Sequence, residues 1–324
     1  MSPITLSDRS PLYIKAAEEL RGNQGQLAAY ESTGHCVALA GPGSGKTKTL
    51  TIKLAKILSE DVSAPRGVAC ITYSNQCARE LKKRLKLLGV EESIRVFIGT
   101  VHSFCFRMVI LPYARLAGLN LPDPVTVASK SEQERLLDEA LTSIDPRGNP
   151  AYRRTPCSEF RKTVLDRNSQ EWLRNDIYRP AIELYEKKLI DSQQVDFDGM
   201  VLMALKLIKE CHWVRAALKA KYPVLVVDEY QDLGVPLHNI VEKLCLVEQI
   251  RLFAVGDPDQ SIYGFNGSRP NLLEDLAKDP DIEQVRLKLN YRCGSDIIKA
   301  SSALIGPDME SKASGSKKRC YFCS

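Results

Sequence analysis

The chain has 324 residues, of which 44% are hydrophobic and 26% charged, a composition typical of globular proteins and unlike that of disordered or collagen-like chains. Its length allows about two domains, and it is too long for a small scaffold stapled by disulfides. Lysine and arginine number 45 against 40 acidic residues, and the resulting net charge of +5 neither requires nor excludes a nucleic-acid partner.

Membrane-spanning runs, signal peptides and cysteine pairs each indicate the compartment of a protein. No apolar run approaches the roughly 18–20 residues that cross a bilayer, and the N-terminus lacks the sections of a signal peptide. We therefore expect a cytoplasmic protein with no membrane partner. Most of the ten cysteines stand singly among apolar neighbours, which favours reduced thiols. Cys320 and Cys323 have metal-ligand spacing, but one such pair supplies only half of a zinc site.

The first predicted unit is a strand, a glycine-rich loop and a helix. The apolar run 36–40 leads into GPGSGKT, and residues 48–60 then show helical periodicity. Apolar, β-branched runs at 67–74, 223–229 and 250–257 repeat the strand pattern, with helix-prone segments between them. This alternation predicts an α/β fold with a parallel sheet covered by helices on both faces.

The glycine-rich segment matches the phosphate-binding loop pattern GxxxxGK[ST], with alanine in place of the first glycine. Such a loop wraps phosphate oxygens with backbone N–H groups, while Lys46 offers a cation to the β- and γ-phosphates and the Thr47 hydroxyl can ligate Mg²⁺. The flanking strand and helix favour this interpretation over a chance turn, so ATP and Mg²⁺ are the expected cofactors. The expected loop residues are Ala40, Gly41, Pro42, Gly43, Ser44, Gly45, Lys46 and Thr47.

A phosphate-binding loop needs a carboxylate at the end of a neighbouring strand, and the run 223–227 ends in Asp228 and Glu229. In this arrangement Asp228 would hold Mg²⁺ and Glu229 would act as the general base on the attacking water. Two acids after a strand can also form a solvated turn. The wholly apolar strand and the Gln231-Asp232 pair that follows favour the catalytic interpretation.

Residues 109–195 have a different sequence pattern, because apolar strand-like runs are replaced by charged, helix-prone segments. This predicts an inserted helical subdomain, with loops at 121–124 and 145–150. The tail from about residue 307 is polar, rich in serine and lysine and without periodicity, so by itself it looks unfolded or incomplete.

Several blocks from about residue 22 to 305 follow the order of motifs in superfamily 1 DNA helicases of the UvrD/Rep/PcrA type, which this chain resembles. Segment 23–29 resembles the adenine-reading Q motif, in which Gln26 would face the adenine. Segments 71–81 and 99–104 resemble the TFTNKAAxEM and TFHSF blocks, which line the single-strand path in that family. Side chains of these types can bind phosphates or pack on a base, and the resemblance implies DNA contacts for Thr72, Tyr73, Asn75, Thr100 and His102.

Two later blocks carry the same resemblance. The string VGDPDQSIYGFNG at 255–267 implies that Gln260 senses the γ-phosphate and that Tyr263 and Phe265 stack on successive DNA bases. Phe265 stands where many relatives carry tryptophan, so we expect weaker stacking.

The last block, 289–297, resembles the NYR motif. In that motif Tyr291 would stack on the adenine and Arg292 would reach the γ-phosphate. Segment 195–200 resembles the DFDDLL helix start, with Gly199 where aspartate is usual, a departure that we expect to affect packing more than catalysis.

The resemblance implies a RecA-like ATP-binding core at 1–108 and 196–290, a helical subdomain at 109–195 and a truncated start of a second RecA-like domain at 291–324. The expected function is that of an ATP-dependent DNA helicase or translocase of 3′-to-5′ polarity, acting on single-stranded or partly duplex DNA. As one chain it would be incomplete, and a second chain could supply the missing domain. The alternative is an ATP-binding, single-strand-DNA-binding regulatory module without autonomous unwinding. A kinase or GTPase is disfavoured, because no acceptor pocket or guanine-reading motif is seen.

Overall fold

A six-stranded parallel sheet forms the centre of the protein. The computed structural model describes residues 11–90, 93–119, 121, 124–260, 271–305 and 310–311. The strands lie in the order β3-β2-β6-β7-β1-β8, and every neighbouring pair is parallel. Their bounds are β1 His35–Ala40, β2 Val68–Thr72, β3 Val96–Thr100, β6 Val224–Val227, β7 Arg251–Gly256 and β8 Ile282–Leu287. The predicted α/β fold is confirmed.

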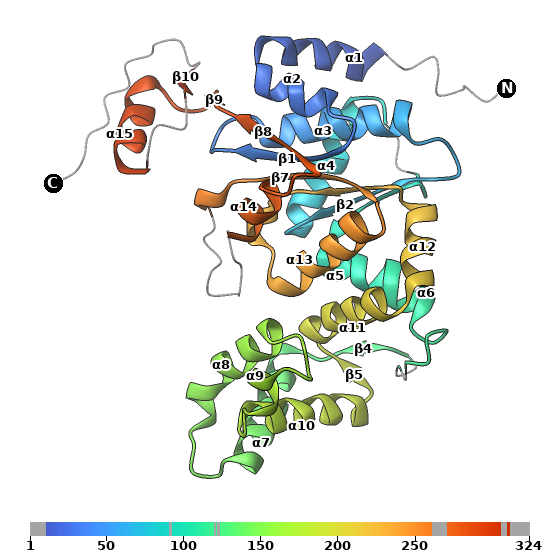
Figure 1. Cartoon of the computed structure of the whole chain (residues 1–324), viewed down its shortest axis with the longest axis vertical. Helices are drawn as coiled ribbons and strands as arrows, with labels where there is room; N and C mark the ends of the chain where they lie inside the picture. Colours follow the sequence, from blue (N-terminus) through green and yellow to red (C-terminus); the bar gives the residue numbers. More distant parts are fainter. Residues whose placement is uncertain are drawn as a thin grey trace.

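Helices cover both faces of this sheet, so its inner strands are apolar on each side. In β6, Leu225 and Val227 join one hydrophobic cluster while Val224 and Val226 join another, because successive side chains of a strand point to opposite faces. In the view of Figure 1 the helices α2 and α3 lie above the sheet and α11 and α13 below it. These helices span α2 Gln24–Glu31, α3 Lys46–Lys56, α11 Phe197–Glu210 and α13 Val235–Glu242.

The sequence patterns predicted β1, β2, β6 and β7 but missed the strands at the two margins of the sheet, β3 and β8. Along β8, buried Ile282, Val285 and Leu287 are interrupted by exposed polar residues such as Glu283 and Arg286. An edge strand is only partly covered by helices. Its solvent-facing polar residues therefore interrupt the continuous apolar run that is typical of the inner strands.

A helical segment made of α7 to α10 lies between β3 and β6, and Figure 1 places these four helices at the opposite end of the molecule from α1 and α2. These helices pack around a hydrophobic cluster of their own that includes Leu141, Trp172 and Ile182. The two-residue strands β4 and β5 pair in parallel where the chain enters and leaves it. The bounds are β4 Thr126–Val127, α7 Lys130–Ile144, α8 Pro150–Thr163, α9 Gln170–Leu173, α10 Tyr178–Asp191 and β5 Gln194–Val195.

The remaining elements flank the sheet or follow it. Cys320 and Cys323, whose spacing supplies only half of a zinc site, lie outside the described residues, and the cysteines that are described are free thiols. Within the described part of the chain no helix is long and apolar enough to cross a membrane. The bounds are α1 Pro11–Glu18, α4 Asn75–Leu87, α5 Val101–Phe104, α6 Leu111–Tyr113, α12 His212–Lys221, α14 Asn271–Ala277, β9 Leu289–Asn290, α15 Ser295–Ile305 and β10 Glu310–Ser311.

Candidate functional site

The predicted phosphate-binding loop joins β1 to α3 and depends on two glycines. Gly43 and Gly45 have φ angles of +72° and +84°, a backbone region that other residues rarely adopt. A Cβ atom on Gly45 would collide with Gln26 Nε2, and one on Gly43 would lie 2.7 Å from Asn290 Oδ1. The positive φ angles and the close neighbouring atoms therefore both require glycine at these two positions. The Ser44 hydroxyl closes the turn by donating to the carbonyl oxygen of Gly41 at 2.8 Å.

Lys46 lies at the first position of α3, and its ammonium group joins the loop to the end of β7. Its Nζ atom donates to the carbonyl oxygen of Ala40 at 3.0 Å, to Asp257 Oδ2 at 3.3 Å and to Gln260 Oε1 at 3.5 Å. Burial raises the pKa of Asp257, and the nearby Lys46 cation opposes that shift. Lys46 and Gln260, both predicted from sequence, are thus in contact. Asp257 was missed as a site residue, although it directly follows a buried strand within the GDPDQ block.

Asp228 directly follows β6, the strand that pairs with β7 in the sheet. Its backbone N–H donates to the carbonyl oxygen of Ile71 at 2.9 Å, and the residue is only 4% exposed. Burial, together with the adjacent Glu229 carboxylate, raises the pKa of Asp228 to about 7. Among the described residues, Asp228 Oδ1 and Asp232 Oδ1 are buried and have no hydrogen-bond partner.

Those two carboxylate oxygens bear on whether the site fits Mg²⁺. Carboxylates and hydroxyls are the oxygen ligands that this ion prefers, and an unpartnered buried oxygen is costly unless something satisfies it. Thr47 adds a half-buried hydroxyl from the first turn of α3. The residues present therefore fit the ion, with Asp228 and Thr47 as the predicted ligands.

Glu229 is held in place by a neighbouring amide. Its φ angle of +52° puts it in the left-handed region. Gln231 Nε2 donates to Glu229 Oε2 at 2.8 Å, and Gln231 Oε1 accepts the backbone N–H of Asp257 at 2.9 Å. Gln231 is 2% exposed and so joins the ends of β6 and β7 from within. The sequence pointed to Gln231 only as a neighbour of the acids, because its partner Asp257 lies 26 positions further along the chain.

The two residues expected to meet the adenine, Gln26 and Tyr291, both hydrogen-bond to the backbone of the loop. Gln26 Nε2 donates to the carbonyl oxygen of Ser44 at 2.8 Å. Asn23 Nδ2 donates to the Tyr291 hydroxyl at 3.0 Å, while Tyr291 remains 43% exposed. Arg292 is exposed, and its Cβ lies 2.7 Å from the position that a Cβ on Gly43 would take. Residues far apart in sequence, Gln26 and Tyr291, are therefore brought to the same loop.

The residues expected to contact DNA lie where β2 and β3 end, at the same edge of the sheet as the loop. Thr72 is 1% exposed and its hydroxyl donates to the carbonyl oxygen of Ser74 at 3.0 Å, whereas Tyr73 is half-buried and Asn75 exposed. Thr100 caps α5 by accepting the N–H of Ser103 at 3.3 Å.

His102, in the same short helix, packs edge-on against Phe197 with 5.2 Å between ring centroids. Burial lowers its pKa, so the imidazole is mainly neutral at pH 7 and offers a polar contact rather than a cation. Tyr263 and Phe265, the expected base-stacking pair, lie outside the described residues.

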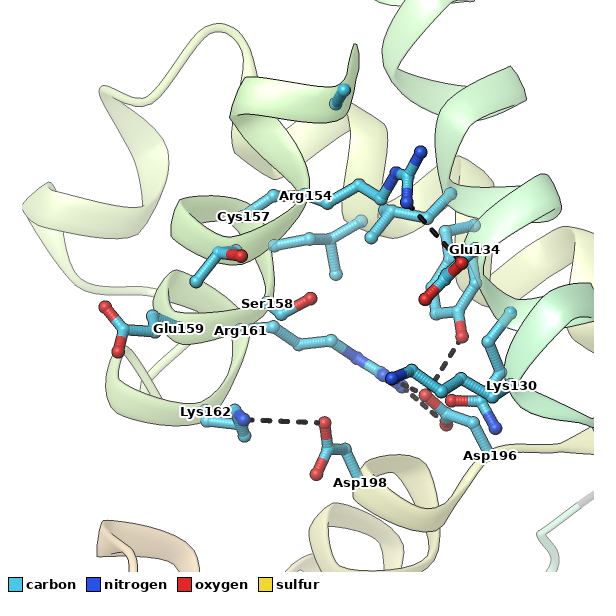
Figure 2. Close-up of a pocket in the computed structure, with 16 residues that line it drawn as sticks. Lys130, Glu134, Arg154, Cys157, Ser158, Glu159, Arg161, Lys162, Asp196 and Asp198 are labelled. Atoms are coloured by element: carbon cyan, nitrogen blue, oxygen red, sulfur yellow. Dashed lines mark hydrogen bonds and ion pairs between the residues drawn. The ribbon is translucent and has the colours of Figure 1, made fainter. Parts of the chain in front are cut away.

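A separate pocket of about 650 Å³ lies in the helical insertion, away from every predicted site residue. Figure 2 shows its lining residues on α7 and α8, with Arg161 paired with Asp196 and Lys162 paired with Asp198. Its lining holds four cations and four acids, so its charge favours neither anions nor cations.

Comparison with known proteins agrees with the resemblance seen in the sequence. Residues 21–281 match the model of the UvrD/REP helicase N-terminal domain. The ATP-dependent DNA helicase Rep of Escherichia coli (strain K12) is 32% identical over 301 residues, covering 88% of this chain and 43% of that protein. The ATP-dependent DNA helicase PcrA of Bacillus subtilis (strain 168) is 30% identical over 293 residues, covering 86% of this chain and 38% of that protein. The chain spans less than half the length of these relatives. It belongs to the UvrD/REP helicase N-terminal domain family.

Proposed function

We propose that this chain is the ATP-binding half of an ATP-dependent DNA helicase or translocase that acts on single-stranded or partly duplex DNA. The proposal rests on the side chains that lie at one edge of the sheet. Lys46 contacts Gln260 there, Gln231 donates a hydrogen bond to Glu229, and Asp228 has a buried carboxylate oxygen without a hydrogen-bond partner. The printed names of the Rep and PcrA relatives support DNA as the substrate. Movement with 3′-to-5′ polarity and a cytoplasmic location complete the proposal.

The chemistry follows from where these groups lie. Backbone N–H groups of the loop and the Lys46 ammonium would hold the phosphates, with Thr47 and Asp228 as ligands of Mg²⁺, which neutralises phosphate charge when bound. Glu229 would accept the proton of the attacking water. Because Gln260 already contacts the Lys46 ammonium, it is positioned to respond to a γ-phosphate there, and Arg292 would approach the same phosphate from beyond β9.

DNA would run along the edge where β2 and β3 end. Exposed Asn75 and half-buried Tyr73 are accessible there, and Thr100 and His102 begin the neighbouring helix α5. Thr72 would act by shaping this edge, since its hydroxyl is engaged with Ser74. Tyr263 and Phe265 would stack on bases, a contact that tolerates any sequence.

In the proposed division of the chain, residues 1–108 and 196–290 form the core and residues 109–195 form the helical insertion. Residues from 291 onward begin a second RecA-like domain. The rest of that domain, with the arginine that assists phosphoryl transfer, would come from a further part of the protein or from a second chain. Such an arginine contributes about 10³–10⁵ in rate. Without this arginine the chain would have the alternative function, that of a nucleotide-dependent module that binds single-stranded DNA.

Steady-state ATP hydrolysis by this chain, with and without single-stranded DNA, tests the proposal. Glu229→Gln is the blank, because it removes the base and keeps the binding groups. DNA-stimulated turnover above that blank supports a motor ATPase. ATP binding without turnover favours the regulatory alternative, and a chain that binds neither ATP nor DNA would refute both.

A further inference from the structure

Asn290, at the end of β9, is a buried residue outside the set predicted to form the site. It is 2% exposed, and its side chain makes three hydrogen bonds. Its Nδ2 atom donates to the carbonyl oxygen of Pro42 at 2.6 Å. Its Oδ1 atom accepts the backbone N–H groups of Arg292 and Cys293, each at 2.8 Å. One amide therefore joins the phosphate-binding loop to the turn that follows β9.

The backbone reinforces this junction. The N–H of Tyr291 donates to the carbonyl oxygen of Gly43 at 2.9 Å. A Cβ on Gly43 would lie 2.7 Å from both Asn290 Oδ1 and the Cβ of Arg292. The two segments, 247 positions apart between Gly43 and Asn290, are thus packed as closely as glycine allows.

Tyr291 is consequently fixed at both ends. Its backbone is tied to Gly43, and its hydroxyl accepts from Asn23 Nδ2 at 3.0 Å. Asn23 also caps α2, where its Oδ1 accepts the N–H of Gln26 at 3.2 Å. The ring proposed to meet the adenine is therefore held by the loop on one side and by the helix of Gln26 on the other.

We propose that Asn290 is a positioning residue for nucleotide binding, one that sets Tyr291 and Arg292 against the phosphate-binding loop. The inference rests on the proposed function of the site. An amide can donate to Pro42 and accept from two N–H groups at once, whereas an ionised carboxylate cannot donate and an aliphatic side chain can do neither. Removal of the amide leaves three part-buried backbone hydrogen-bonding groups unpaired, and the turn carrying Tyr291 and Arg292 is then no longer held against the loop.

Binding of fluorescent ADP and ATP analogues to the whole chain tests this inference without requiring turnover. We expect Asn290→Ala to weaken both affinities by about tenfold and to lower the Tm, because the hydrogen-bonding groups that it leaves unpaired also cost stability. Asn290→Asp keeps the acceptor for Arg292 and Cys293 but loses the donor to Pro42, and it should weaken binding comparably. The matched control is Asn239→Ala, because Asn239 makes one bond within α13, to the carbonyl oxygen of Val235 at 2.9 Å. That variant should bind as the wild type does.

A double-variant cycle with Tyr291→Ala separates positioning from general support of the fold. If Asn290 acts partly through Tyr291, Asn290→Ala will weaken binding less in the Tyr291→Ala background than in the wild type. Unchanged affinity in the Asn290 variants, or fully additive effects in the cycle, would overturn the inference and leave the proposed function standing. Failure of the wild type to bind either analogue would instead overturn the proposed function. Should Asn290→Ala not fold, Asn290→Asp decides by the same criteria.

Discussion

Arg161 and Asp196 form a buried two-bond ion pair that joins the helical insertion to the core. Arg161 Nη1 and Nη2, on α8, donate to Asp196 Oδ2 and Oδ1 at 2.6 and 3.2 Å (Figure 2). Asp196 caps α11, which packs on the sheet, by accepting the N–H of Gly199 at 2.9 Å. Tyr185 and Glu186 on α10 complete the network, at 3.0 Å to Asp196 and 2.8 Å to Arg161. Helices from both parts of the chain therefore meet at one carboxylate.

Breaking this pair should destabilise the protein strongly. Arg161→Met leaves the Asp196 carboxylate buried without its cation, and we expect the free energy of unfolding to fall by about 3–5 kcal/mol. Urea unfolding followed by circular dichroism measures the change. Arg135→Met is the matched control, because Arg135 pairs with Glu132 and Glu139 on the exposed face of α7. An Arg161→Met variant as stable as that control would contradict the structural role.

The same pair predicts an acid limit to stability. Burial by itself would raise the pKa of Asp196, but the Arg161 cation and the hydrogen bonds from Gly199 and Tyr185 outweigh it, so the pKa is lowered from 3.8. A carboxyl group with a lowered folded-state pKa stabilises the fold above its unfolded pKa, and that contribution is lost as the pH falls through the folded value. We expect the free energy of unfolding to decline below about pH 4.

Asp196→Asn is the comparison for this pH dependence, measured by urea unfolding at several pH values. The variant is expected to be less stable at neutral pH, since Arg161 loses its charge partner, and to show a shallower decline in acid. Glu186 and Asp198, the other acids near the pair, remain in the variant and set its residual slope. Parallel curves for the two proteins would assign the acid effect to groups other than Asp196.

Gly199 shows where sequence patterns stop being informative. A Cβ at this position would collide with Asp196 Oδ1 and would lie 3.1 Å from Arg161 Nη2, so glycine fits against the ion pair. No local pattern announces this, because Arg161 lies 38 positions earlier in the chain. The phosphate-binding loop and the acids after β6 could be predicted, since their chemistry is written in consecutive residues. Gln231 and Asn290 could not, because each takes its role from a partner brought close only by the sheet.

Gln231→Met should slow turnover without weakening nucleotide binding. The substitution keeps the length of the side chain but removes both the 2.8 Å bond from Nε2 to Glu229 and the acceptor of the Asp257 N–H at 2.9 Å, so the proposed base loses its orientation. Because a positioned general base contributes about 10²–10⁴ in rate, we expect kcat for ATP to fall about tenfold or more with little change in KM. Gln133→Met, which removes a bond to the carbonyl oxygen of Ala128 in the insertion, is the control. A raised KM with unchanged kcat would assign Gln231 to binding instead.

Binding of single-stranded DNA should fall steeply with salt. Contacts to phosphates release counterions, and a protein that makes several of them loses affinity by orders of magnitude between about 50 and 200 mM salt. Fluorescence anisotropy with an oligothymidine measures this slope, and a flat response would rule out phosphate contacts as the main source of affinity. Asn75→Ala separates the contributions, because Asn75 is exposed at the start of α4 and carries no charge. We expect it to lower the affinity at every salt concentration while leaving the slope unchanged, whereas loss of a phosphate-binding lysine or arginine would reduce the slope itself.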